Sequence, residues 1–136
     1  MGLDMMVYAQ VPDQKDPEDG FAPGVEVAYW RKASAVHRWF VEKCQNGVDE
    51  CQLTPITREQ LEALRAAAEN VLAAPPDARV AVATGAGLLP QAGFFFGTTE
   101  MGDWYVEYLT KTVDQLSGVL NNQDLAEAKF FYRSSW

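Results

Sequence analysis

The segment that most constrains the fold is the run from Val25 to Gln45, VEVAYWRKASAVHRWFVEKCQ. On a helical wheel, at about 100° per residue, its apolar side chains gather on one side, which predicts one amphipathic helix. The only histidine of the chain, His37, falls in the middle of this apolar side. We therefore expect the other elements to pack against this helix face.

The opposite side of the predicted helix is basic and carries one large aromatic ring. Either another segment covers Trp39 there, or its ring is left at the surface, where exposed aromatic side chains often mark contact sites. The sequence thus predicts a partner-binding surface made of Arg31, Lys32, Arg38, Trp39 and Lys43.

The charge of the chain is unevenly distributed. Its 19 acidic and 11 basic residues give a formal net charge of −8. Four of the basic residues and only one acidic residue lie between Arg31 and Lys43. The negative net charge argues against direct nucleic-acid binding, and it favours either high solubility or a basic partner. The predicted first helix is then a basic island on an acidic body.

The length of 136 residues fits one domain spanning 1–136, with a core large enough to need no cofactor, metal or disulfide. No apolar run approaches the ~20 residues of a membrane-spanning helix, so we expect no membrane association. The first residues have no basic segment followed by an apolar run, which predicts no signal peptide and a cytoplasmic protein. His37, Cys44 and Cys51 are evenly spaced, but no fourth ligand is apparent, so we expect reduced thiols and no metal site.

The remaining elements follow from alternation, turn residues and capping signals. They are a strand over Leu3–Val11, an acidic Pro/Gly-containing loop over 13–24, a helix over Arg58–Ala74 opened by a capping box of Thr57 and Gln60, a short strand or loop over Val80–Thr84, a short strand over Gly93–Gly97, a third helix capped by Thr98 or Thr99, and a last strand over Ala128–Trp136. This order predicts a single α+β domain, with about three helices packed on a small, mainly antiparallel sheet.

The third helix presents a second aromatic surface, because Trp104, Tyr108 and Lys111 fall outside its core stripe. One interpretation is that these rings cover the sheet. The other is a ligand-binding site for a nucleotide-like small molecule, in which Trp104 and Tyr108 stack on the ligand and Arg31 or Lys32 contacts its phosphates.

His37 is a weak candidate for a catalytic base, with Cys44 further along the helix and Asp4 or Glu100 as the group that orients it. A single histidine in an apolar stripe is more often a hydrogen-bonded core residue. No known catalytic motif accompanies it. We therefore assign no catalytic residue.

Four pieces of the chain carry a resemblance: MGLDM at Met1–Met5, YWRKASAVHRWF at Tyr29–Phe40, GFFFGTTEMGDWY at Gly93–Tyr105, and FYRSSW at Phe131–Trp136. With these, the chain resembles a family of small, uncharacterised proteins of bacteriophages and prophages. The resemblance implies expression in the bacterial cytoplasm during infection and a role in countering host defence or redirecting host machinery. It implies no catalytic residue.

Three functions are compatible with the sequence. The first is a phage-encoded accessory binding protein that modulates or inhibits a host or phage protein, including as an anti-defence factor. The second is a small-molecule binding protein for a nucleotide-like ligand, and the third is a small enzyme that uses His37. The unexplained aromatic residues also allow a homo-oligomer, in which they would meet their symmetry mates.

Overall fold

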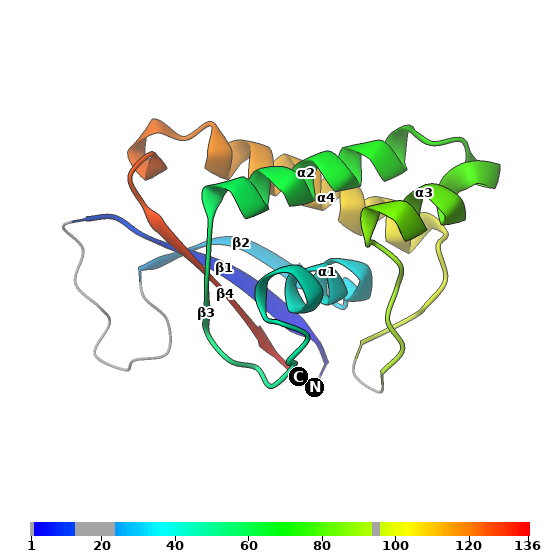
Figure 1. Ribbon diagram of the computed structural model, residues 1–136, viewed down its shortest axis with the longest axis horizontal. Coiled ribbons are helices and arrows are strands. Elements are labelled where there is room, and N and C mark those ends of the chain that lie inside the picture. Colours follow the sequence, from blue (N-terminus) through cyan, green and yellow to red (C-terminus); the bar gives the residue numbers. More distant parts are fainter. Residues whose placement is uncertain (1, 13–23, 94–95) are drawn as a thin grey trace.

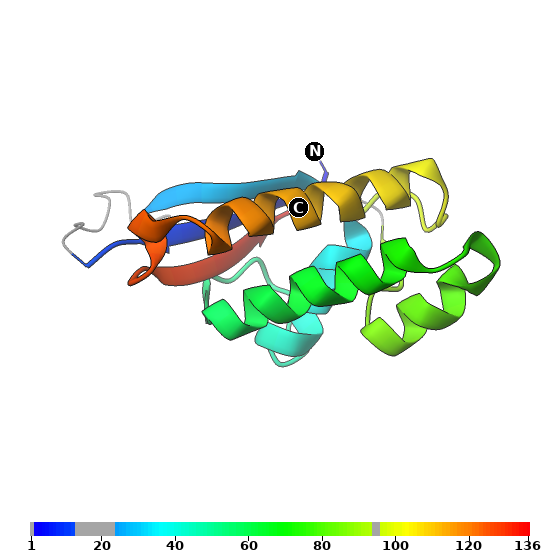
Figure 2. The same cartoon turned by 90° about the horizontal axis from the view of Figure 1, so that it is seen from above.

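Helices cover one face of a four-stranded antiparallel sheet in the computed structural model, which describes residues 2–12, 24–93 and 96–136. Its elements are β1 (Asp4–Gln10), β2 (Val25–Arg31), α1 (Ser34–Cys44), β3 (Thr54–Ile56), α2 (Arg58–Ala73), α3 (Arg79–Ala86), α4 (Asp103–Leu120) and β4 (Lys129–Ser135), with short 3-10 turns at Pro76–Ala78 and Gln123–Leu125. α2 and α4 pack side by side above the sheet, and α3 lies at one end of the molecule (Figures 1 and 2). The predicted α+β class is confirmed, with four α-helices in the described residues rather than about three.

The strand order in the sheet is β2-β1-β4-β3. β1 and β4 are central, and their side chains alternate between the two faces. Met5, Val7 and Ala9 of β1 face the helices and are fully buried. Met6 and Tyr8 face the other way and form a small second cluster with Tyr29, Leu53 and Phe131. The outer strand β3 is short and contains Pro55, both of which are usual features of a sheet edge.

The main core lies between the sheet and the helices. Its centre is a stack of Phe40 from α1 on Tyr132 from β4, with ring centroids 3.9 Å apart. Trp30 of β2 lies edge-on to Phe40 at 6.0 Å. The core therefore joins α1, the middle of the sheet and the edge strand β2.

The prediction of one helix over Val25–Gln45 is wrong for its first third. Residues 25–31 form β2, which pairs antiparallel with β1 from Asp4 opposite Arg31 to Ala9 opposite Val25. Lys32 follows with a φ of 53°, a left-handed conformation that separates the strand from α1. Val25, Val27 and Tyr29 are strand-favouring residues, and pairing with β1 outweighs the helical spacing.

Three further predictions need correction between residues 79 and 103. Residues 79–86 form α3, which ends at Gly87 in the left-handed conformation, and not a strand or loop. The Phe96 N–H donates to the Gly93 carbonyl at 3.1 Å, and neither of these residues nor Gly97 belongs to a strand. The predicted strand over Gly93–Gly97 is therefore wrong for its described part, and residues 94 and 95 lie outside the described residues.

α4 begins at Asp103 with Gly102 as its N-cap, and not at Thr98 or Thr99. The hydroxyl of Thr98 accepts from the Glu100 N–H before the helix begins. The side chain of Thr98 therefore stabilises the connection that leads into α4.

Other elements agree closely with the sequence-based prediction. α2 carries the capping box, because the Thr57 hydroxyl accepts from the Gln60 N–H at 3.0 Å and the Gln60 side chain accepts from the Thr57 N–H at 2.9 Å. β1 and β4 lie within the predicted terminal strands. The predicted acidic loop over 13–24 lies outside the described residues except for Gly24. Within the described ranges, none of the helices is long and apolar enough to cross a membrane.

Candidate functional site

A groove of about 550 Å³ follows the line where the edge strand β2 meets α4, and we call it the β2–α4 groove. Two of its lining residues come from β2 and six from α4. They are Trp30, Arg31, Trp104, Glu107, Tyr108, Thr110, Lys111 and Asp114. The groove therefore unites two segments that are more than seventy residues apart in the chain.

Hydrogen bonds fix β2 against α4. The Trp30 indole N–H donates to the Thr112 hydroxyl at 2.9 Å, and the Tyr29 backbone N–H donates to the Gln115 side-chain oxygen at 2.8 Å. This second bond satisfies an outward-facing backbone group of an edge strand, which would otherwise be available to pair with another strand. The two walls of the groove are thus held in a defined relative position.

Aromatic rings form the apolar part of the groove. Trp30 and Tyr108 are almost fully buried, whereas Trp104 is 41% exposed. The Trp104 ring lies edge-on to Tyr108, with centroids 6.0 Å apart, and its indole N–H points to the Lys32 carbonyl at 3.4 Å. Trp104 is therefore a surface ring whose orientation is restrained by its neighbours.

The buried hydroxyl of Tyr108 accepts a hydrogen bond from the Ala35 backbone N–H at 3.3 Å, at the start of α1. Burial raises the pKa of Tyr108 to about 12, so the hydroxyl stays protonated at neutral pH. The prediction that Trp104 lies outside the core is confirmed, whereas the matching prediction for Tyr108 is wrong. Tyr108 nevertheless lines the groove with Trp104.

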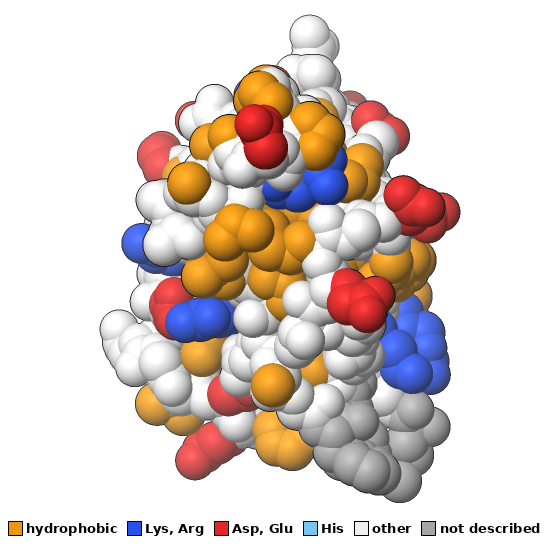
Figure 3. Space-filling view, turned by 90° about the vertical axis from the view of Figure 1, so that its right-hand side faces the viewer, with side chains coloured by type: hydrophobic (Ala, Val, Ile, Leu, Met, Phe, Trp, Pro, Cys, Tyr) orange, Lys and Arg blue, Asp and Glu red, His pale blue; other side chains and the backbone are white. Residues whose placement is uncertain are grey.

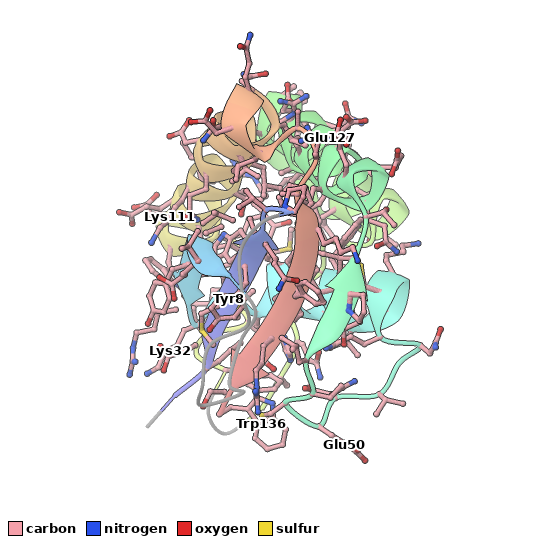
Figure 4. All side chains as sticks on the ribbon, turned by 90° about the vertical axis from the view of Figure 1, so that its left-hand side faces the viewer. Tyr8, Lys32, Glu50, Lys111, Glu127 and Trp136 are labelled. Atoms are coloured by element: carbon pink, nitrogen blue, oxygen red, sulfur yellow. The ribbon has the colours of Figure 1, made fainter. Side chains whose placement is uncertain are left out.

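Both cations of the groove already have partners. The Arg31 guanidinium forms an ion pair with Asp4 at 3.1 Å, and the Tyr29 hydroxyl also donates to Asp4. This bond to Asp4 is the main reason that the pKa of Tyr29 is raised. The Lys111 ammonium lies 5.6 Å from the centre of the Tyr29 ring, within cation–π range. Lys111 and Lys32 both project at the β2 side of the sheet (Figure 4).

The two carboxylates of the groove, unlike the Arg31 guanidinium, form no ion pair among the described residues. They are Glu107 and Asp114, and both are exposed on α4. Glu107 lies three residues after Trp104, which places the two side chains next to each other on the helix. The groove thus has an aromatic surface bordered by unpaired negative charge.

The predicted partner-binding surface around Trp39 does not form. Trp39 is only 4% exposed and lies edge-on to Phe40 at 5.5 Å. Gly87, at the end of α3, lies directly over it: a Cβ atom on Gly87 would be 3.7 Å from the Trp39 ring. The C-terminal end of α3, a helix that the sequence did not predict, therefore lies over Trp39.

The basic residues of that predicted surface lie in two places. Arg31 and Lys32 belong to β2 and the connection after it, whereas Arg38 and Lys43 remain on the outer side of α1. Arg38 forms an ion pair with Glu42 at 3.0 Å. Arg38 and Glu42 line a cleft of about 170 Å³ against the end of α3. At the end of the molecule that carries α3, exposed hydrophobic side chains lie among charged ones (Figure 3).

His37 is fully buried and has a partner at each ring nitrogen. Its Nε2 lies 3.0 Å from an Asp49 carboxylate oxygen, and its Nδ1 lies 2.6 Å from the Tyr132 hydroxyl. The same Asp49 oxygen accepts from the Trp136 indole N–H at 3.1 Å. An Asp49 acceptor fixes the proton on Nε2, so Nδ1 accepts from Tyr132. These hydrogen bonds connect α1 to β4 and, through Asp49, to Trp136.

Burial lowers the pKa of His37, and the nearby Asp49 carboxylate opposes that change. A fully buried imidazole with both nitrogens occupied is a structural group, so the geometry gives no support to the catalytic interpretation. The expected orienting residues lie elsewhere: Asp4 pairs with Arg31, and Glu100 is exposed. The sequence missed Asp49 because it follows the helix in a loop, where no spacing rule predicts its position.

The described residues contain no group of three or more His, Cys, Asp or Glu side chains that could hold a metal ion. Both cysteines are free and partly buried. Burial raises the pKa of Cys44 to about 11, which keeps it a thiol at neutral pH.

No family model, curated protein or solved structure matches this chain.

Proposed function

We propose that this chain is a non-catalytic binding protein that holds part of its partner in the β2–α4 groove. The observation that carries the proposal is the exposed Trp104 ring beside a groove of about 550 Å³ with buried Trp30 and Tyr108 in its lining. Concave, mainly apolar sites with a few charged groups are the usual form of binding sites. Tryptophan is also enriched among the residues that contribute most to protein–protein affinity.

The resemblance to bacteriophage and prophage proteins supports a biological setting for this binding. In that setting the chain is an accessory protein in the cytoplasm of the infected bacterium. It modulates or inhibits a host or phage protein, with an anti-defence role as one form of this activity. The net charge of −8 supports a partner with a basic surface, because opposite charges speed association and orient the encounter.

Affinity purification from an expressing bacterial host tests the proposal. Tagged wild-type protein is compared with Trp104→Ala and with Trp136→Ala, and the bound proteins and small molecules are identified by mass spectrometry. Trp136 is the matched control, because it is 44% exposed and lies at the end of β4, away from Lys111 (Figure 4). We expect a stoichiometric partner with the wild type and Trp136→Ala and its loss with Trp104→Ala. Equal recovery with all three proteins contradicts a role for the groove.

A nucleotide-like small molecule is the second candidate occupant. Trp104 offers a face on which a base can stack, and Arg31 and Lys111 line the same groove. A thermal-shift screen with nucleotides and cyclic dinucleotides tests this candidate. Stabilisation that Trp104→Ala removes supports it, and an unchanged melting temperature across the panel argues against it. Light scattering of the wild type and of Trp104→Ala shows whether the chain forms a homo-oligomer and whether the groove is needed for it.

A further inference from the structure

The residues of α4 that line the groove alternate in charge along one helix stripe. Trp104 is followed by Glu107, Lys111 and Asp114, at spacings of three, four and three residues. Residues at these spacings lie on one side of a helix. Glu107 and Asp114 are seven residues apart, which separates them by about 10 Å along the helix axis.

With Asp4 included, the charges at the groove sum to −1, because Arg31 and Lys111 are positive and Asp4, Glu107 and Asp114 are negative. Arg31 is paired with Asp4, and the Lys111 ammonium lies over the Tyr29 ring. Glu107 and Asp114 have no salt-bridge partner among the described residues. An incoming phosphate would compete with Asp4 for Arg31 and approach two carboxylates. An incoming cation would meet two carboxylates that form no salt bridge among the described residues, and an exposed indole, on a chain of net charge −8.

We propose that the β2–α4 groove binds an arginine side chain from a basic segment of a partner protein. The guanidinium stacks on Trp104 and donates to Glu107, and a second basic residue of the same segment reaches Asp114. The inference rests on the proposed function of the groove and names the chemistry of its occupant.

Arginine fits this site better than lysine for a geometric reason. Its guanidinium is flat, so one face can lie on an aromatic ring while the N–H groups at its edge donate to a carboxylate. A lysine ammonium is compact and strongly hydrated, and it has no flat face to stack. Trp104 and Glu107, adjacent on the helix, provide both kinds of contact at once.

Calorimetric titration with a short blocked peptide tests the inference. The probe contains two arginines separated by two glycines, since residues three apart in an extended chain span about 10 Å, the same as the axial spacing of Glu107 and Asp114. The matched ligand is the same peptide with both arginines replaced by citrulline, which keeps the shape and removes the charge. ATP is titrated separately as the anionic aromatic ligand.

Three variants locate the interaction on the protein. Glu107→Gln and Asp114→Asn remove charge with little change in size. Glu62→Gln makes the same change at an exposed glutamate of α2, outside the groove lining, and serves as the control. We expect Trp104→Ala and Glu107→Gln each to weaken peptide binding about fivefold or more, Asp114→Asn to weaken it less, and Glu62→Gln to leave it unchanged. Added salt should weaken binding further.

The outcomes separate this inference from the proposed function. Equal binding of the citrulline peptide, unchanged binding by Glu107→Gln, or no binding of the arginine peptide up to millimolar concentration overturns the arginine assignment. If Trp104→Ala still abolishes capture of a partner or binding of ATP, the groove keeps its function with a different occupant. If Trp104→Ala changes neither capture nor any titration, both proposals fail.

Discussion

Replacing Trp39 with alanine should lower the free energy of unfolding by about 3–5 kcal/mol, the usual cost of removing a buried tryptophan. Trp39 is 4% exposed, packs edge-on against Phe40 and lies under Gly87 at the end of α3. The substitution removes the aromatic contact between α1 and the end of α3 and leaves a cavity there. α3 has only one fully buried residue of its own, Ala83, so it has few other contacts that could close the cavity.

Urea unfolding followed by circular dichroism measures this effect. A domain of this length has a free energy of unfolding of roughly 7–20 kcal/mol, so the predicted loss is a large share of the total. The melting temperature should fall by roughly 10 °C or more. Trp104→Ala is the matched control, because it makes the same change at a 41% exposed ring and should cost less than about 1 kcal/mol. A Trp39→Ala protein within about 1 kcal/mol of the wild type would refute the packing of α3 over α1.

Three further predictions follow from individual contacts. Thr57→Ala should lower the free energy of unfolding by about 1 kcal/mol, because it removes the capping box of α2. Thr98→Ala should change it by less than about 0.5 kcal/mol, because Thr98 does not cap α4. Equal losses in urea unfolding would contradict the start of α4 at Asp103. Burial lowers the pKa of His37, so below about pH 6.5 the unfolded chain binds more protons than the folded chain. The free energy of unfolding should therefore fall, as the pH is lowered through this range, by up to about 1.4 kcal/mol per pH unit. The same dependence of unfolding free energy on pH in His37→Gln would contradict this. Cys44 has a pKa of about 11, so at pH 8 it should react with iodoacetamide roughly two orders of magnitude more slowly than a free thiol. The rate is measured by mass spectrometry in a variant whose other cysteine is replaced by serine. Alkylation at the rate of a free thiol would show that Cys44 is not buried.

Elements with local signals were predictable from the sequence. The capping box of Thr57 and Gln60 and the regular apolar stripe after it define α2 within a few residues. The alternation of β1 and β4 likewise reflects the two faces of the sheet. In these elements the local preference and the tertiary environment agree.

In residues 25–45 the local pattern and the tertiary environment favour different structures. Its apolar residues fit a helical wheel throughout, but Val25–Arg31 also fits an extended strand, and its pairing partner β1 lies fifteen or more residues earlier in the chain. A helical wheel carries no information about such a partner. The buried position of Trp39 depends in the same way on α3, whose sequence contains Gly85 and gives a weak helix signal.

The candidate site was predictable in part. Trp104 and Lys111 stood out because they lie off the core stripe of their helix, and the spacing of Glu107 and Asp114 on the same stripe could have added them. The opposite wall could not be predicted, since Trp30 and Arg31 were expected on a helix and not on an edge strand. The pairing of Arg31 with Asp4, which decides the charge available in the groove, depends on the same strand.

Occupation of the β2–α4 groove by a ligand beside Trp104 can be followed by ¹⁹F NMR of protein labelled with 5-fluorotryptophan. The chain has four tryptophans, of which Trp104 and Trp136 are exposed. Single substitutions assign each resonance, and the arginine peptide is then added in steps. We expect the Trp104 resonance to shift progressively to saturation while the Trp136 resonance stays in place. A stationary Trp104 resonance under conditions where calorimetry detects peptide binding would place the binding site elsewhere on the protein and overturn the proposed role of the β2–α4 groove.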